Sequence, residues 1–145
     1  MAQATQTYRN HTRWFPPFHF FVMPVLTLNF LNAIRHLYKE PTLHETWELI
    51  VAAALMTLAL LARVMAVTVQ DRVICLEMRL RLHEVLPADL RSRIRELTRQ
   101  QFVALRFASD AELTDLVRQI LAGTLPKQKD IKLKVKDWQG DYLRA

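Results

Sequence analysis

The chain has 145 residues, with 20 Lys and Arg against 14 Asp and Glu, and a formal net charge of +6 at pH 7. Its 2 Gly and 6 Pro favour helices joined by short connections over sheets with many turns, so we expect an all-α fold. Its one cysteine, Cys75, excludes an intrachain disulfide, and no Cys/His cluster has metal-ligand spacing, so we expect no metal or other cofactor.

The first element is a charge-free stretch over residues 14–34, which contains no Asp, Glu, Lys or Arg. A helix of this length crosses about 30 Å of hydrocarbon, so we predict a transmembrane helix over residues 14–36 after an N-terminal arm at 1–13. Its start is aromatic, as suits the membrane interface, and Pro24 should kink it. The stretch is too long and too rich in Phe and Pro for a signal peptide, so we expect it to be retained.

A second charge-poor stretch, residues 49–69, is interrupted only by Arg63. It predicts a second transmembrane helix over 47–69, after an external connection at 37–46. Arg63 lies near the cytoplasmic end, where its side chain could reach a lipid headgroup or pair with a polar group of another helix.

The positive charge sets the orientation. Sixteen of the 20 Lys and Arg lie from Arg63 onward. Because positively charged flanks stay in the cytoplasm, two spans place both termini there.

A packing seam follows the second span and continues past it. Its members recur at alternating steps of three and four, which predicts one stripe along a helix with a cytoplasmic extension over residues 70–86. In lipid, alanine at such a seam lets helix backbones approach closely. The partner could be the first span, a helix of the cytoplasmic portion or a second copy. The seam consists of Ala52, Leu55, Ala59, Ala62, Ala66, Val69, Val73, Leu76 and Leu80.

The remaining residues, 87–145, predict a small helical cytoplasmic portion. We expect helices over 87–97 and 99–107, the second capped by Thr98, with Leu90, Ile94 and Leu97 inward in the first. Ser109 to Glu112 has the pattern of a capping box, and it should open a third helix that Gly123 ends.

A lysine-rich tail follows Pro126. Its strict alternation of Lys with apolar residues fits a strand, but Ile131, Val135 and Trp138 also have helical spacing, and we predict helix because no second strand is evident. Its lysines either contact an anionic membrane surface or form a solvated face; the candidates for lipid contact are Lys132, Lys134 and Lys136.

Several runs resemble one family. They are RVICLEMRLRL at 72–82, LRFASD at 105–110 and WQGDYLRA at 138–145, with YRNH at 8–11. They resemble a family of short, uncharacterised bacterial two-span membrane proteins with no assigned activity. The resemblance implies a location in the bacterial inner membrane and leaves the role open.

The leading functional hypothesis is a non-enzymatic membrane protein that self-associates, or serves as an accessory subunit of a larger complex, through the seam. We see no nucleophile with an oriented base that would indicate an enzyme.

One alternative is a membrane-tethered module that binds anionic lipid or nucleic acid. Nucleic-acid binding would use an arginine cluster, but we find no helix-turn-helix signature, and the membrane orientation accounts for these arginines equally well. The cluster is Arg91, Arg93, Arg95 and Arg99. Another alternative is a small oligomeric channel or transporter component with few polar residues, which are Thr27, Asn29 and Thr57.

Overall fold

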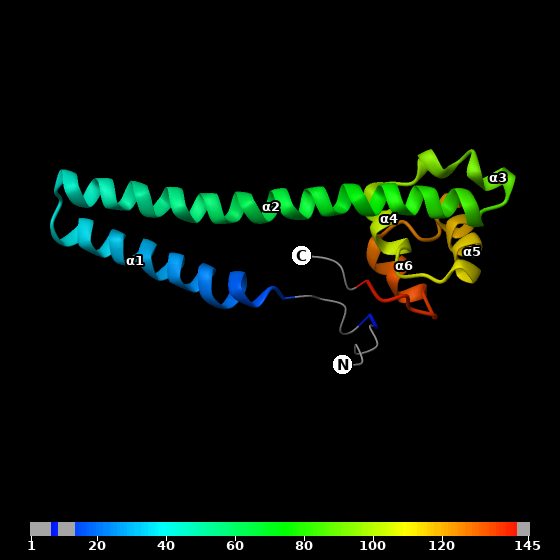
Figure 1. Cartoon of the computed structure of the whole chain (residues 1–145), viewed down its shortest axis with the longest axis horizontal. Helices are drawn as coiled ribbons and strands as arrows, with labels where there is room; N and C mark the ends of the chain where they lie inside the picture. The colour runs from blue at the N-terminus through cyan, green and yellow to red at the C-terminus, as the bar shows by residue number, and fades with distance from the viewer. Residues whose placement is uncertain (1–6, 9–13, 142–145) are drawn as a thin grey trace. The chain divides into compact units, whose positions relative to one another are not determined.

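A computed structural model describes residues 7–8 and 14–141 (Figure 1). Every regular element in these ranges is a helix, which confirms the predicted all-α class for the described residues. The predicted arm at 1–13 lies outside them except for Thr7 and Tyr8, and so does the end of the chain from residue 142. In chain order the elements are η1 (Pro17–Val22), α1 (Met23–Lys39), α2 (Leu43–Val85), α3 (Ala88–Arg91), η2 (Ile94–Glu96), α4 (Arg99–Leu105), α5 (Asp110–Leu121) and α6 (Gln128–Lys134).

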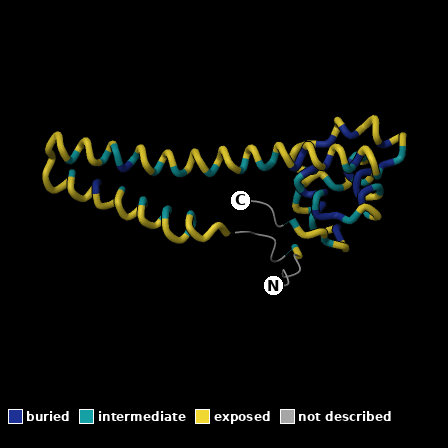
Figure 2. The backbone as a smooth tube through the Cα atoms, in the orientation of Figure 1, coloured by how far each residue is buried: buried dark blue, intermediate teal, exposed yellow. Residues whose placement is uncertain are grey.

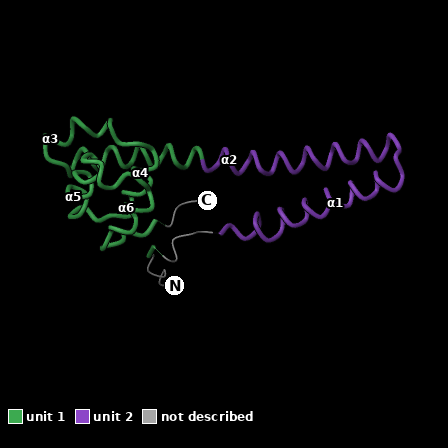
Figure 3. The backbone as a smooth tube through the Cα atoms, turned by 180° about the vertical axis from the view of Figure 1, so that it is seen from behind, with its two compact units in different colours: residues 1–12, 68–144 green, residues 13–67, 145 purple. Residues whose placement is uncertain are grey.

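The chain divides into two compact units, coloured in Figure 3. One comprises residues 13–67 and 145, and the other residues 1–12 and 68–144. Helix α2 contributes to both, because it runs without a break from Leu43 to Val85.

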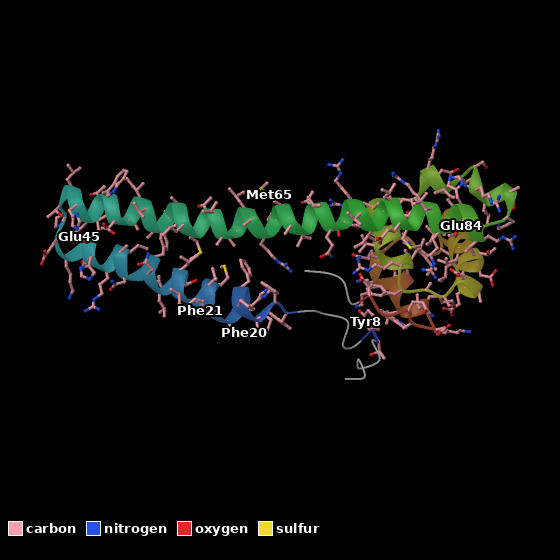
Figure 4. The ribbon with its side chains drawn as sticks, viewed as in Figure 1. Tyr8, Phe20, Phe21, Glu45, Met65 and Glu84 are labelled. Atoms are coloured by element: carbon pink, nitrogen blue, oxygen red, sulfur yellow. The ribbon has the colours of Figure 1, made fainter. Side chains whose placement is uncertain are left out.

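The unit of residues 13–67 exposes its apolar surface. The helical stretch 17–39 and helix α2 are long and apolar enough to cross a membrane, with mean hydropathies of 1.4 and 2.3 in their most apolar windows. Only 6% of each window is buried, whereas the core helix of a water-soluble protein would be mostly buried. Phe20 and Phe21, for example, are exposed on η1 (Figure 4).

The first of these two stretches begins as a π-helix. In η1 the N–H of Met23 donates to the carbonyl of Phe18, five residues back, and Pro24 follows in the first turn of α1. Proline has no N–H to donate, so one backbone hydrogen bond is missing at Pro24 in any case. The helix changes from π-helical to α-helical hydrogen bonding at this point. The predicted irregularity at Pro24 thus takes the form of a π-helical turn before it.

Residues 40–42 alone separate α1 from α2. The N–H of Glu40 closes the last turn of α1 on the carbonyl of His36 at 2.9 Å, and the Thr42 hydroxyl accepts from the N–H of Glu45 at 3.2 Å. Because the connection is so short, the chain reverses its direction between α1 and α2. Figure 1 shows α1 beside the first half of α2. Two small residues, Ala33 and Ala52, are the buried ones among the described residues of this unit.

The other unit is built around the last turns of α2. The cluster of buried residues there is dark blue in Figure 2. Helix α2 supplies one apolar stripe to it, and the shorter helices supply the rest, including Phe102, Leu105, Leu113 and Ile131. The α2 stripe consists of Ile74, Cys75, Met78 and Leu82, and Leu86 continues it directly after the helix ends.

Helix 87–97 of the prediction is two short pieces, α3 and η2. Its expected inward face is correct, because Leu90, Ile94 and Leu97 are all buried. The break follows Arg91, where the Ser92 hydroxyl donates to the carbonyl of Asp89 at 3.1 Å. Such local side-chain bonds offer the backbone an alternative to helix.

The two predicted caps have different outcomes. Thr98 caps α4 in a full capping box with Gln101. Ser109 occupies the N-cap position of α5, but its side chain makes no capping bond. The expected capping box of α5 is therefore wrong, and its acidic member Glu112 has other partners: it accepts the N–H groups of Lys136 and Asp137 at 3.1 and 3.2 Å.

The helix assignments in the rest of this unit are confirmed. Gly123, at a φ of 78°, follows the end of α5 as expected of a terminating glycine. The lysine-rich tail forms helix α6 over Gln128–Lys134. After it the chain pairs briefly with residues before α5, where the N–H of Gln139 donates to the carbonyl of Phe107 at 2.8 Å and Trp138 stacks on the Phe107 ring.

Candidate functional site: the outer face of α2

Helix α2 carries a second apolar stripe in the unit of residues 68–144. Val69, Val73, Leu76 and Leu80 are 60, 49, 59 and 61% exposed, respectively. At about 100° per residue they lie on the side of α2 opposite the buried stripe that begins at Ile74. The seam of the sequence analysis is thus present in this unit as a continuous, exposed aliphatic strip, which we call the outer stripe.

The alanine part of the seam belongs to the unit of residues 13–67. There Ala52 is 2% exposed and Ala59 is half-buried, whereas Ala62 and Ala66 are exposed. Leu55 is exposed as well. Within this unit the single chain therefore covers the seam at Ala52 and in part at Ala59, and it leaves Ala62 and Ala66 open.

A groove borders the outer stripe. It has a volume of about 620 Å³, and three arginines stand around an aliphatic and aromatic floor. The Arg99 Nε lies 3.8 Å from the Asp71 Oδ2, and the Arg79 guanidinium carbon lies 5.3 Å from the centre of the Phe102 ring. Positive charge over an apolar floor suits an anionic amphiphile such as a phospholipid. The lining residues are Val69, Arg72, Val73, Cys75, Leu76, Arg79, Arg99 and Phe102.

Cys75 is buried, at 8% exposure. Burial raises the pKa of its thiol, and the positive charge of Arg79 opposes that rise only in part. A thiol that is buried and protonated is a poor nucleophile, so this cysteine is suited to packing and not to chemistry.

The arginine cluster considered for nucleic acid is largely engaged within the chain. The Arg91 Nε donates to the carbonyl of Leu86 at 2.6 Å. Arg93 binds both carboxylate oxygens of Glu96, at 2.8 and 2.7 Å. These contacts raise the pKa of the exposed Arg93 and lower that of Glu96. Arg91 also lines a depression of about 630 Å³ together with Arg79, His83 and Arg95, so part of the cluster lies at one basic surface.

The predicted lipid-contact residues are divided between the two units. Arg63 belongs to the unit of residues 13–67, and the three lysines belong to the other. Lys132 lies with its ammonium nitrogen 5.4 Å from the centre of the Phe107 ring. Lys134 and Lys136 border a depression of about 180 Å³ that also holds Glu112 and Asp115, so acidic groups partly offset their charge.

Two of the three polar residues considered for a channel form hydrogen bonds within their own helices. The hydroxyls of Thr27 and Thr57 donate to the carbonyls of Met23 and Ala53 in their own helices, both at 2.8 Å. Among the residues that the structure describes, no group of three or more His, Cys, Asp or Glu could hold a metal ion.

One contact was not foreseen from the sequence. The Arg81 Nε donates to the Asp110 Oδ1 at 2.7 Å, and another nitrogen of the same guanidinium donates to the carbonyl of Ala108 at 2.8 Å. These bonds join α2 to the start of α5. No short-range pattern could have indicated them, because the partners are 29 and 27 residues apart.

The whole chain, residues 1–145, matches a protein-family model described as Family of unknown function (DUF6526). The chain belongs to this family. No curated protein and no solved structure matches it in the same comparisons. The family assignment agrees with the absence of an assigned activity in the resemblance noted from the sequence, and it leaves the function to be argued from the outer face of α2.

Proposed function

We propose that the protein is a non-enzymatic helical protein of the bacterial inner membrane, and that it associates with further copies of itself through the seam of α2. In this proposal the helical stretch 17–39 and the first part of α2 cross the bilayer. Both termini lie in the cytoplasm, together with the unit of residues 68–144.

The observation that carries the proposal is the outer stripe. It consists of four aliphatic side chains, each about half exposed or more, and it lies in a segment where charged residues surround it. The buried stripe of the same helix already satisfies the unit's own core. A continuous apolar strip that the chain does not cover indicates an interaction surface.

Cysteine crosslinking tests this proposal. Leu80 is the last member of the outer stripe, and a disulfide between two copies requires their Cβ atoms to come within about 4.5 Å. In a Cys75→Ala background, Leu80→Cys should give a crosslinked species of twice the chain's mass when membranes are oxidised. Arg118→Cys, at an exposed position of α5, is the matched control and should stay monomeric.

Two results would overturn self-association. One is equal crosslinking of both cysteines, which would indicate random collision. The other is the absence of any crosslinked species together with a monomer in mild detergent and in bilayers.

A further inference from the structure

Charged residues flank the outer stripe, with positive charges on one side of it and negative charges on the other. The stripe repeats every seven residues, and in heptad notation Val73 and Leu80 are a positions whereas Val69 and Leu76 are d positions. The g positions beside it are Arg72 and Arg79, and the e positions on its other side are Glu77 and Glu84. Thus one edge of the stripe is basic and the other edge is acidic.

These four flanking side chains are exposed, and Glu84 is labelled on α2 in Figure 4. The ion pairs found among the described residues involve other arginines: Arg81, Arg93, Arg99 and Arg106. Of the four flanking residues, Arg79 makes a cation–π contact, with its guanidinium carbon 5.3 Å from the centre of the Phe102 ring. Within the described chain, Arg72, Glu77 and Glu84 therefore keep their charges available to a partner.

One basic edge and one acidic edge favour a second copy as the partner, and they favour a parallel over an antiparallel orientation of the two helices. In a parallel pair of helices each g residue faces the e residue five positions later on the other strand. Arg72 would then meet Glu77 of the second copy, and Arg79 would meet Glu84 of the second copy. An antiparallel pair would instead place arginine against arginine and glutamate against glutamate, which is repulsive.

We propose that residues 69–84 of α2 form a parallel two-stranded coiled coil with the same residues of a second copy, held in register by the Arg72–Glu77 and Arg79–Glu84 pairs. Two copies inserted in one membrane with the same topology are parallel already. A β-branched residue at a, Val73, followed by leucine at d, Leu76, is the combination that favours two strands. The apolar part of the pairing ends at Leu80, because the next d position is the exposed His83 and the next a position is Pro87. This inference rests on the proposed self-association and specifies its geometry.

Charge reversal tests the register. In full-length protein in bilayers, with association measured by energy transfer between labelled copies, Arg72→Glu should weaken dimerisation by about tenfold. It replaces an attractive contact by a repulsive one at two symmetry-related places. Glu77→Arg should weaken it to a similar extent. The double variant Arg72→Glu/Glu77→Arg restores opposite charges across the pair and should regain most of the lost affinity.

Arg99→Glu is the matched control, because Arg99 lines the neighbouring groove but lies on α4 and outside the heptad edges. It should leave dimerisation unchanged. Circular dichroism of each variant checks that its helix content is retained, so that a loss of association is not a loss of fold.

The outcomes separate the two proposals. If the double variant stays as weak as the single ones while Leu80→Cys still crosslinks, the coiled-coil register is wrong and self-association remains. If Arg72→Glu and Arg99→Glu weaken association and Glu77→Arg does not, an anionic ligand in the groove joins the copies, and the register is again overturned. A monomer under all conditions overturns both.

Discussion

At the scale of single residues, Arg81 has the greatest structural consequence for the small helical unit. Its bonds to Asp110 and to the Ala108 carbonyl hold α2 against the start of α5. Asp110 is 64% exposed, so the ion pair alone contributes little. The bond to the part-buried carbonyl matters more, because its loss leaves a polar group without that donor in a protected place.

We expect Arg81→Ala to lower the free energy of unfolding of this unit by about 1 kcal/mol. Thermal unfolding followed by circular dichroism measures the change, and the midpoint temperature should fall. Arg118→Ala, at an exposed position of α5, is the control and should change stability by less than about 0.5 kcal/mol. Equal shifts for both variants would contradict the role given to Arg81.

At the scale of elements, the two N-caps show what local sequence can and cannot reveal. Thr98 and Gln101 are three residues apart, and their capping box formed as the pattern predicts. Ser109 and Glu112 have the same spacing, but Glu112 instead holds the chain after α6, 24 and 25 residues away. A carboxylate that can accept two backbone N–H groups has a stronger alternative than a single capping bond. That choice depends on the folded arrangement, which local spacing does not contain.

The caps can be tested as a matched pair. Thr98→Ala removes a side-chain acceptor that is in use, at 3.4 Å from the N–H of Gln101, and should destabilise the unit by about 1 kcal/mol. Ser109→Ala removes a hydroxyl that makes no capping bond and should cost less than half as much. Thermal unfolding followed by circular dichroism measures both variants. A larger loss from Ser109→Ala would mean that the box predicted from the sequence does form.

Helix periodicity was the most reliable guide at this scale. The buried faces of α3 and η2 were predicted correctly, because burial follows the 3.6-residue period wherever the helix packs on a core. On α2 the same reasoning found the outer stripe and overlooked the buried one. Both stripes fit helical spacing, and the sequence does not show which of them meets the chain's own core. The α2 stripe that begins at Ile74 became visible only with the fold.

At the scale of the whole molecule, the two apolar helical stretches and the charge distribution make a prediction about topology. The residues that connect α1 to α2 should face the outside of the membrane, because two spans return the chain to its starting side. In a Cys75→Ala background, Glu40→Cys should react in intact spheroplasts with a maleimide that cannot cross membranes. Arg118→Cys should react only after permeabilisation. Labelling of Arg118→Cys from outside would reverse the proposed orientation.

The helical class and the two long apolar stretches followed from composition and length alone, since so few glycines and such long charge-poor runs leave little other choice. The helix in the lysine-rich tail was also predicted from the sequence. Ile131 and Val135, whose helical spacing indicated it, are both buried around α6. The contacts between distant segments did not follow. The Trp138 ring on Phe107 and the Glu112 bonds join residues that local patterns treat separately.

The two faces of α2 have a consequence for how the family can diverge. Substitutions at Val73 or Leu80 change a surface on which the monomer's core does not depend, whereas substitutions at Met78 or Leu82 disturb the core itself. If the protein self-associates as proposed, natural selection can therefore alter the choice of partner while the fold is preserved. Two family members in one cell would then each assemble only with copies of themselves, after changes at a few positions along one side of a single helix.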